Sequence, residues 1–496
     1  MSPRRTPQRL APSIALAAVL ALFAAAPAGA AATWRSKVTI VASDRLRWES
    51  VDWFAPPVGA APPGAATHDF FANQLRLGLR GTLPHAQLYV EAQDVRLVHL
   101  PDDASLAAPY GNLGPGANYY FFERERDPGE TILRQAVLTV RSGSASAALG
   151  RFEQADGLET QPADADLLWL KKARIAERLL GPFGFSHVGR TVDGLRLVVD
   201  RPAWNATALG VRPTAGGFEV SGGEELDEVT LLGASVTGKK LLAATPADAR
   251  AFFFRYDDER VEDGVPVRVD NRPLATRQGD RGAIRVNTWG GHAATIVDAG
   301  AAHIDALAWG ALQTGAWGAQ DHRAWAGALE VGAHWPHGPG SPWLRAGLDV
   351  ASGDDDPADG RHGTFLQLLP TPRIYALFPF FNLMNVEDRF VQLVVKPHPK
   401  VLVRADYHAL RLESSADLWY GGGGAIRQDV FGFSGTPANG QRDLAHLLDV
   451  SVTANPHRRV TIAGYLGHAA GEDVVGATFA GDADATYGFL ETTLRW

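Results

Sequence analysis

The sequence predicts an all-β fold, a transmembrane antiparallel β-barrel of about 18 strands with short periplasmic turns and long extracellular loops. Segments of about ten residues in which apolar and polar side chains alternate recur along the whole chain. The connections between these segments alternate between short and long. Beyond the N-terminus, no stretch holds the roughly 20 consecutive apolar residues that a membrane-spanning helix needs. A chain with this pattern can cross a membrane only as a closed barrel.

The strands are predicted from this alternation, which is clear in the last segment, Ala485–Trp496. There Leu490 and Trp496 share one face, whereas Glu491 and Arg495 lie on the other. An apolar row that ends in an aromatic residue suits a lipid-facing strand at the membrane interface. The other predicted strands are 36–48, 73–80, 88–93, 133–141, 147–151, 192–200, 204–211, 229–237, 250–256, 281–296, 303–313, 322–335, 343–350, 389–396, 401–412, 444–454 and 460–468.

The connections sort by length, as in bacterial outer-membrane barrels, whose periplasmic turns are short and whose extracellular loops are long. The predicted short turns are 81–84, 142–144, 201–202, 241–247, 298–300, 337–341, 397–399 and 455–457. The predicted long loops are 51–69, 99–130, 153–190, 213–227, 257–280, 353–388, 413–443 and 470–484, and the brief 315–320 is the one exception. With both termini at the short-turn end, this pattern requires an even number of strands.

The N-terminus predicts a secretory signal peptide over residues 1–30, followed by the barrel over 31–496. Arg4, Arg5 and Arg9 precede an apolar run, and Ala28-Gly29-Ala30 provides small residues for cleavage. A signal anchor is the alternative, which the helix-breaking Pro27 disfavours. These features predict a protein of the bacterial outer membrane.

The composition and the absence of known motifs exclude several classes of protein and kinds of site. The net charge of −8 argues against a nucleic-acid partner, because such proteins usually carry a basic field. The chain has no cysteine, so disulfide scaffolds, cysteine-ligated metal sites and catalytic thiols are excluded. It contains no G-x-S-x-G motif and no H-E-x-x-H pair. We therefore predict no cofactor and no enzymatic activity.

One long loop has helical spacing of its own, over Asp166–Leu180. Leu168, Ile175 and Leu179 fall near one face, and the segment ends at Gly181-Pro182. The favoured interpretation is a loop helix packed on the barrel rim. A basic gate over the pore mouth and a short strand are the alternatives.

Several stretches resemble the outer-membrane alginate-export family, and together they extend over nearly the whole mature chain. They are Leu133-Arg134-Gln135-Ala136 with Ala148-Leu149-Gly150-Arg151; Arg174–Leu179 with Gly181–Phe185 and Val188–Gly194; and Ser352–Asp355 with His362–Phe365, Leu368–Arg373 and Phe378–Asn385. The resemblance implies a monomeric eighteen-stranded barrel that passes an anionic uronate polysaccharide outward through an arginine-lined pore. Outer-membrane lipid and periplasmic export machinery are the other partners that it implies.

The lumen is predicted from the polar rows of the strands. If the apolar rows face lipid, nine arginines face inward, and rings of arginine favour anions in a pore. Tyr89 is expected to contact sugar faces. The predicted pore-lining and substrate-binding residues are Arg45, Arg47, Arg76, Arg80, Tyr89, Glu91, Arg151, Asp193, Arg196, Arg285, Arg345, Asp349, Arg404 and Asp406.

Two interpretations of these arginines stay open, because the same rows carry acidic residues. The arginines could bind the carboxylates of a polyuronate, or they could form structural ion pairs with their neighbours across the lumen. An acidic loop at Asp354, Asp356 and Asp359 is a weak calcium candidate, since its spacing is not that of an EF-hand, and a solvated loop is the favoured interpretation.

Three alternatives to an export channel follow. The first is a general or specific porin for uptake of small anionic solutes, with the same fold. The second is a barrel enzyme such as an outer-membrane lipase or protease. The third is a secreted soluble β-protein that degrades polysaccharide.

Overall fold

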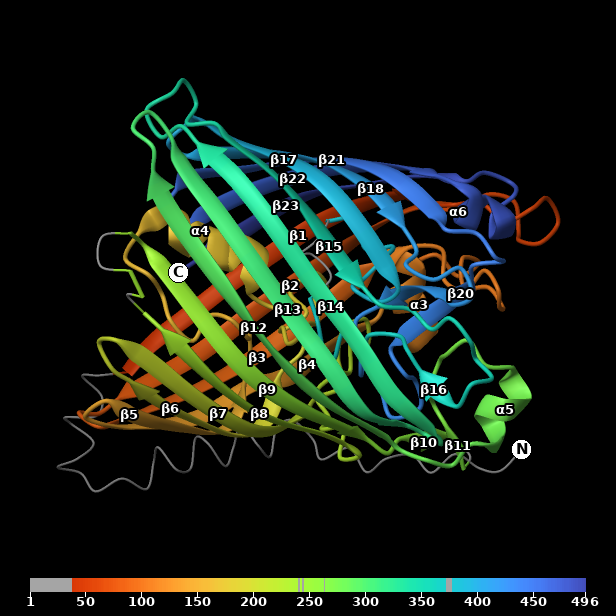
Figure 1. Cartoon of the computed structure of the whole chain (residues 1–496), viewed down its shortest axis with the longest axis horizontal. Coiled ribbons are helices and arrows are strands. Elements are labelled where there is room, and N and C mark those ends of the chain that lie inside the picture. The colour runs from red at the N-terminus through yellow and green to blue at the C-terminus, as the bar shows by residue number, and fades with distance from the viewer. Residues whose placement is uncertain (1–37, 240, 243–244, 263, 372–376) are drawn as a thin grey trace.

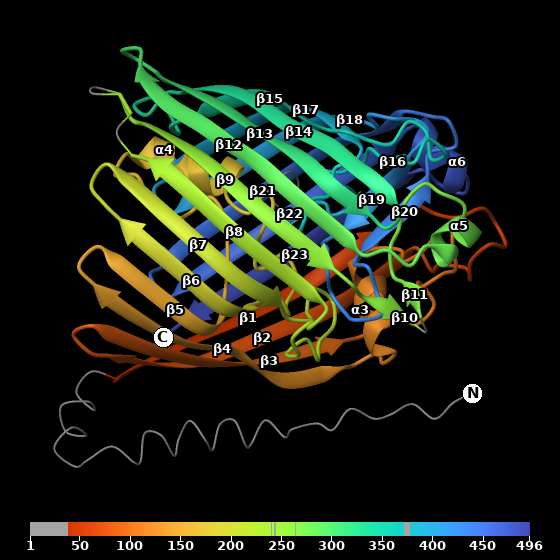
Figure 2. The same ribbon diagram turned by 60° about the horizontal axis from the view of Figure 1, so that its bottom comes forward.

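The computed structural model describes residues 38–239, 241–242, 245–262, 264–371 and 377–496. The predicted signal peptide lies outside these residues. Eighteen antiparallel strands form a closed barrel in which each strand pairs with its neighbours along the chain, and the last strand, β23, closes on the first, β1. The predicted fold class and strand number are therefore confirmed. Figures 1 and 2 show the strands tilted around a common axis.

The barrel strands match the predicted segments one for one. They are β1 (Val38–Asp52), β2 (Thr67–Thr82), β3 (Ala86–Val98), β4 (Gly129–Ser142), β5 (Ala145–Phe152), β6 (Val192–Asp200), β7 (Trp204–Pro213), β8 (Val229–Gly238), β9 (Ala247–Asp258), β12 (Ile284–Asp298), β13 (His303–Trp317), β14 (Gln320–His334), β15 (Trp343–Ala351), β17 (Val386–His398), β18 (Val401–Arg411), β21 (Asp443–His457), β22 (Val460–Gly471) and β23 (Asp484–Arg495).

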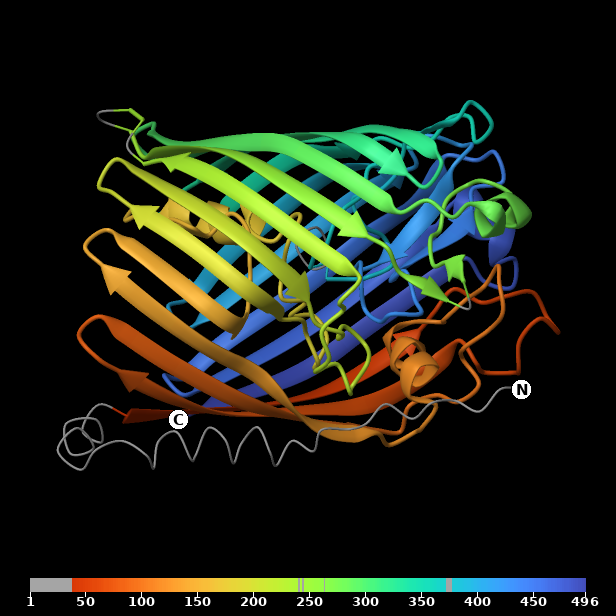
Figure 3. The same cartoon turned by 90° about the horizontal axis from the view of Figure 1, so that it is seen from below.

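The long loops contain short helices and strands. They are helices α3 (Pro115–Glu123), α4 (Ala165–Leu170), α5 (Leu274–Gly279) and α6 (Asp473–Thr478), the π-helix η1 (Lys171–Ile175), and strands β10 (Val261–Glu262), β11 (Val265–Pro266), β16 (Arg361–His362), β19 (Leu418–Gly422) and β20 (Phe433–Pro437). Among the described residues, no helix has the length and apolar character to cross a membrane. Figure 3 shows α3, α5 and α6 gathered at one end of the barrel, whereas α4 lies towards the other.

Alternation along the strands separates a lipid-facing surface from the lumen. On β13 and β14, the outward Leu312 and Leu329 are 64% and 66% exposed, whereas the inward Gln313 is 1% exposed. Large apolar side chains in contact with water would be costly, but in a bilayer they face hydrocarbon. The short-turn end carries the C-terminus and is the periplasmic end (Figure 1).

The long-loop end is filled by the loops themselves. Their aromatic side chains, among them Phe54, Phe183, Phe218, Phe380 and Trp419, form one buried cluster with the inner faces of the strands. Many of these rings meet edge to face, such as Tyr119 and Phe218 with centroids 5.0 Å apart. The extracellular half of the lumen therefore contains an apolar core.

Candidate functional site

The loop between β5 and β6, residues 153–191, runs inside the barrel, and we call it the lumen loop. Its helix α4 begins after Asp164, whose side chain accepts a hydrogen bond from the Leu167 amide at 2.8 Å. Asp166 reaches the periplasmic end, where its carboxylate contacts His303 at 2.6 Å and His334 at 2.9 Å. The segment is therefore helical in its first half but lies in the lumen, so the predicted position on the rim is wrong.

The helix ends earlier than the predicted Leu180. Ala176 leaves the helical conformation, and Glu177 adopts a left-handed φ of 64°. The chain then runs extended, with Leu180 bridged to Leu369 of another long loop. This early end lets the two arginines that flank the turn reach the barrel wall together.

A buried ionic cluster, the loop clamp, fixes the lumen loop to β14 and β15. Arg174 contacts Glu330 at 2.9 Å and Asp349 at 3.2 Å, and Arg178 contacts the same two carboxylates at 2.7 and 2.6 Å. Arg345 joins the cluster through Glu330 at 3.0 Å. All five side chains are at most 1% exposed, so water does not solvate these charges. Each charge is stabilised by its oppositely charged neighbours.

The opposite end of the lumen loop is held by β1–β4. Arg45 donates to the carbonyls of Gly184 and Phe185 at 3.3 and 3.1 Å. Gln93 donates to the carbonyl of Val188 at 2.9 Å, and Arg134 donates to the same oxygen at 3.1 Å. Because it is attached to both walls, the lumen loop divides the lumen.

Eleven of the fourteen predicted pore residues lie on inward faces. Most of the arginines among them are already paired: Arg47 with Glu491 at 2.7 Å, Arg345 with Asp305 at 2.9 Å, and Arg404 with Asp406. Tyr89 donates to Glu91 at 2.5 Å instead of facing open space. The inward residues are Arg45, Arg47, Arg76, Arg80, Tyr89, Glu91, Arg196, Arg345, Asp349, Arg404 and Asp406.

The predicted inward orientation of Arg151, Asp193 and Arg285 is wrong. Arg151 and Asp193 pair with each other at 2.6 Å, on the faces that carry the exposed Leu149 and Leu195. Arg285 shares its face with the exposed Trp289 and pairs with Glu259 at 3.1 Å. Near the loop end, the inward rows of these strands are apolar because they pack on the aromatic loops, so the polar rows face outward.

The periplasmic half of the lumen contains a cavity of about 420 Å³, here called the periplasmic cavity. It is lined by Arg80, Arg141 and Arg196 together with Tyr89 and by amide and hydroxyl groups. Arg80 lies over the Tyr89 ring at 5.0 Å, and Arg196 lies over the Phe152 ring at 5.0 Å. None of the three arginines forms an ion pair within the part of the chain that the structure describes.

Two glutamates also line the periplasmic cavity, but other arginines neutralise them. Glu153 pairs with Arg76 and Arg134 at 3.0 Å, and Glu159 pairs with Arg250 at 2.6 Å. Burial alone would raise the pKa of each glutamate, but the neighbouring guanidinium groups outweigh it and lower the pKa of both. Both glutamates stay ionised in ion pairs, so Arg80, Arg141 and Arg196 give the cavity a net positive charge.

The comparison with protein families settles which family this chain belongs to. The family model described as alginate export matches residues 80–482. The chain belongs to the alginate export family. No match to a curated protein sequence was found.

Solved structures show the same fold at low sequence identity. The outer membrane protein OpdK from Pseudomonas aeruginosa has a TM-score of 0.53 and 10% identity, over 92% of this chain and 99% of that chain. P. aeruginosa OccK9 (OpdG) has a TM-score of 0.55 and 11% identity, over 93% and 99%. Acinetobacter baumannii OccAB4 has a TM-score of 0.54 and 9% identity, over 92% and 98%. This alginate export family member is therefore a β-barrel of the bacterial outer membrane.

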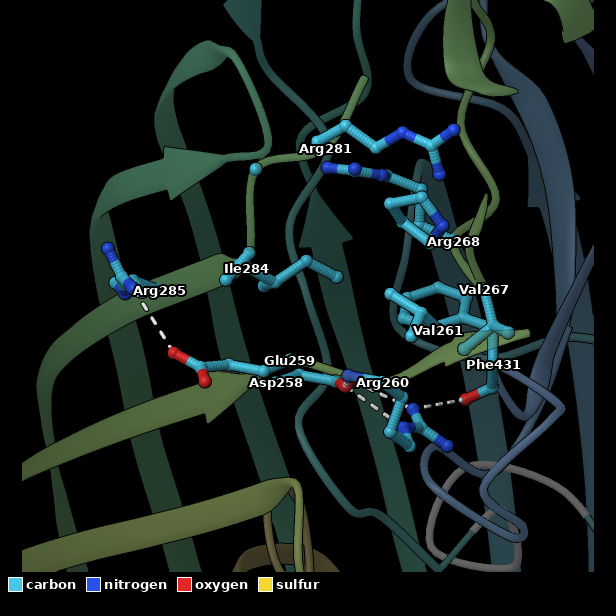
Figure 4. A pocket seen from close by; sticks show the side chains of 13 residues that line it. Asp258, Glu259, Arg260, Val261, Val267, Arg268, Arg281, Ile284, Arg285 and Phe431 are labelled. Carbon is cyan, nitrogen blue, oxygen red and sulfur yellow. Dashed lines mark hydrogen bonds and ion pairs between the residues drawn. The ribbon is translucent and has the colours of Figure 1, made fainter. Parts of the chain in front are cut away.

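The extracellular end of this family member carries a second arginine-rich recess, of about 400 Å³ (Figure 4). Arg260 is held by Asp258 at 2.7 Å and by the carbonyl of Phe431 at 3.1 Å. Arg268 pairs with Asp280 at 3.3 Å, and Arg281 extends beside it (Figure 4). Here most guanidinium groups have an anionic partner, in contrast to the periplasmic cavity.

The calcium candidate of the sequence lies in the extracellular loop before β17. Asp354, Asp356 and Asp359 each accept a backbone amide two residues ahead, at 3.3, 2.9 and 2.7 Å, which are turn contacts. Among the described residues, groups with metal-binding spacing occur at two other places, Asp166–His303–His334 and Asp406–His408–Asp449. The acidic loop is therefore explained as a series of turns.

Asp354 predicts a pH dependence of this loop. Burial is the main cause that raises the pKa of Asp354 from 3.8 to about 7, and the nearby Asp417 carboxylate raises it further. A carboxyl group with a raised pKa in the folded state stabilises that state below its ordinary pKa, and the contribution is lost as pH rises through about 7. We expect amide hydrogen exchange in residues 352–371 to accelerate from about pH 4 to about pH 7, after correction for intrinsic rates.

Matched variants test this pH dependence. Asp354→Asn should flatten it, because the amide stays neutral throughout, whereas Asp356→Asn in the same loop should leave it in place. An unchanged pH dependence in Asp354→Asn would assign the effect to another group.

Proposed function

We propose that this protein passes an anionic polysaccharide or oligosaccharide, of the polyuronate type, through its lumen by diffusion. The observation that supports the proposal is the periplasmic cavity, in which Arg80, Arg141 and Arg196 lack carboxylate partners among the described residues. A guanidinium group binds a carboxylate through two parallel hydrogen bonds and stays charged at every relevant pH. A polyuronate presents one carboxylate on each sugar, so neighbouring arginines suit consecutive residues of the chain.

The other groups of the periplasmic cavity suit a sugar. Gln87, Gln135 and Thr207 line it with amide and hydroxyl groups that pair with ring hydroxyls. The proposal therefore assigns binding to Arg80, Arg141 and Arg196 instead of to the nine arginines predicted from the sequence. Arg141 was not among the predicted residues, and its position at the end of β4 carried no signal beyond its charge.

A barrel of the same fold has been solved with a sugar acid bound. P. aeruginosa OccK2 (OpdF), solved in complex with glucuronate, has a TM-score of 0.53 and 9% identity, over 92% of this chain and 96% of that chain. Glucuronate is a single uronate sugar. At this identity the likeness concerns the fold, and the substrate class is argued from the cavity.

The second candidate is a porin for small anionic solutes. The lumen loop favours it, because a loop attached to both walls by the loop clamp and by Arg45 narrows the passage. The two candidates share the periplasmic cavity and differ in whether the lumen loop moves aside for a polymer. The absence of enzymatic activity, the monomeric state and a periplasmic export partner remain predictions.

Block of single-channel current tests the proposal. Oligouronates added to the periplasmic side of a planar bilayer should interrupt the current, and Arg80→Gln/Arg196→Gln should weaken the block at least tenfold, or about 1.4 kcal/mol. Arg285→Gln is the matched control, since Arg285 lies on the outward face and already pairs with Glu259.

The length dependence separates the two candidates. Block that strengthens with the number of uronate units supports polymer passage, whereas block by monomeric glucuronate alone supports the small-solute porin. Equal block in the double variant and the wild type would contradict the assigned cavity.

A further inference from the structure

Three buried side-chain atoms on the inner wall, formed by β17, β18 and β21, lack a hydrogen-bond partner among the described residues. The atoms are Asp406 Oδ1, His408 Nε2 and Asp449 Oδ2, and their residues are at most 1% exposed. The Asp449 carboxylate also accepts a hydrogen bond from the Leu377 amide. Asp406 and Asp449 lie directly opposite each other in β18 and β21, and His408 follows two residues on, so all three share one face. Burying an acceptor without a donor costs free energy unless a bound cation interacts with it.

The contacts of His408 leave its Nε2 available as a metal ligand. Its Nδ1 lies 2.9 Å from the Asp388 carboxylate of β17, which requires the proton to be on Nδ1. In the neutral imidazole Nε2 carries the lone pair, and ligand atoms of the two aspartates lie within 4.8 Å of that of His408. A carboxylate that holds the far nitrogen of an imidazole is the arrangement that orients metal-ligating histidines.

The charges of the surrounding wall leave an anionic excess. Among the described residues, Asp388 pairs with His408, Asp406 pairs with Arg404, and Asp449 lies directly opposite Asp406. Asp449 forms no ion pair with any described residue. A divalent cation between Asp406 and Asp449 would offset this negative charge.

We propose that Asp406, His408 and Asp449 bind a divalent metal ion of the Zn²⁺ type. Their ligand atoms lie within 4.8 Å of one another, so small rotations of the side chains bring all three to the roughly 2.0–2.2 Å of zinc bonds. Mixed nitrogen and oxygen ligands suit Zn²⁺ better than the all-oxygen preference of Ca²⁺. The ion would join β18 to β21 and make the lumen wall less anionic. This proposal does not depend on the transported solute.

The second group with metal-binding spacing serves as an internal control. Asp166 Oδ2 is hydrogen-bonded to His303 Nδ1 at 2.6 Å and to His334 Nδ1 at 2.9 Å. His334 Nε2 is hydrogen-bonded to Ser341 Oγ at 2.8 Å. Hydrogen bonds within the group account for its geometry. Its histidines lie at the periplasmic end and can be changed without touching β18 or β21.

Zinc retention by the full-length protein folded in detergent tests the proposal. The protein is stripped with dipicolinate, given Zn²⁺, desalted and analysed by mass spectrometry of the metal. We expect the wild type to retain a single Zn²⁺, His408→Gln and Asp449→Asn to lose it, and His303→Gln/His334→Gln to keep it. Heat-modifiable migration on gels verifies the fold of each variant, and Asp449→Asn is nearly isosteric.

Co²⁺ provides a spectroscopic check in the same samples. Visible ligand-field absorption should appear in the wild type and be lost in Asp449→Asn. Failure of the wild type to retain Zn²⁺ would overturn the site, and so would loss of Zn²⁺ in the His303/His334 variant but not in His408→Gln.

Discussion

Replacing Arg174 and Arg178 together by alanine is expected to release the lumen loop and raise the single-channel conductance severalfold. The two guanidinium groups hold Glu330 and Asp349 at 2.6–3.2 Å in a region that is at most 1% exposed. Removing one side of a buried ion pair costs about 3–5 kcal/mol, because the remaining charges stay buried without partners. The double variant leaves Asp349 without its two arginine partners and Glu330 with Arg345 alone, so the closed position of the loop is lost.

The measurement is conductance in planar bilayers, together with proteolysis of the lumen loop. Arg212→Ala is the control, since its pair with Glu225 is 48% and 35% exposed and is worth at most about 1 kcal/mol. Unchanged conductance in the double variant, with the loop accessible to protease, would show that the loop does not set the pore width.

Leu329→Arg is expected to destabilise the barrel by about 2–4 kcal/mol, because arginine near the bilayer midplane faces hydrocarbon. Leu329 lies on the outward row of β14 and is 66% exposed. The matched change Leu83→Arg, in the periplasmic turn after β2, should cost about 0–1 kcal/mol, because the headgroup region solvates the charge.

Denaturant titration of the protein folded into lipid vesicles measures both variants. Equal destabilisation at the two positions would mean that the outward row of β14 does not face the bilayer.

The barrel itself could be predicted from the sequence because its signals are local. Alternation over a single strand identifies that strand, and the length of each connection identifies the end of the barrel at which it lies. The even strand number and the closure of β23 on β1 follow from the same pattern. None of these inferences needs a contact between distant residues.

The lumen could be predicted only in part, because its contents depend on distant contacts. The rule that apolar rows face lipid fails where loops fill the pore: Ile284 and Val286 are inward and buried on aromatic loops, so Arg285 faces outward. Arg178 meets Glu330 across 152 residues of sequence, which no local pattern reveals. The arginines of the lumen loop were visible as a basic helical segment, but their partners were not.

Reversal potential under a salt gradient tests the central claim. The claim is that the arginines of the periplasmic cavity, which have no carboxylate partner among the described residues, make this barrel an anion channel. The wild type should be anion-selective, and Arg80→Gln/Arg141→Gln/Arg196→Gln should shift the reversal potential towards zero. Heat-modifiable migration verifies that the triple variant is folded. A cation-selective wild type, or a triple variant with unchanged selectivity, would contradict the account.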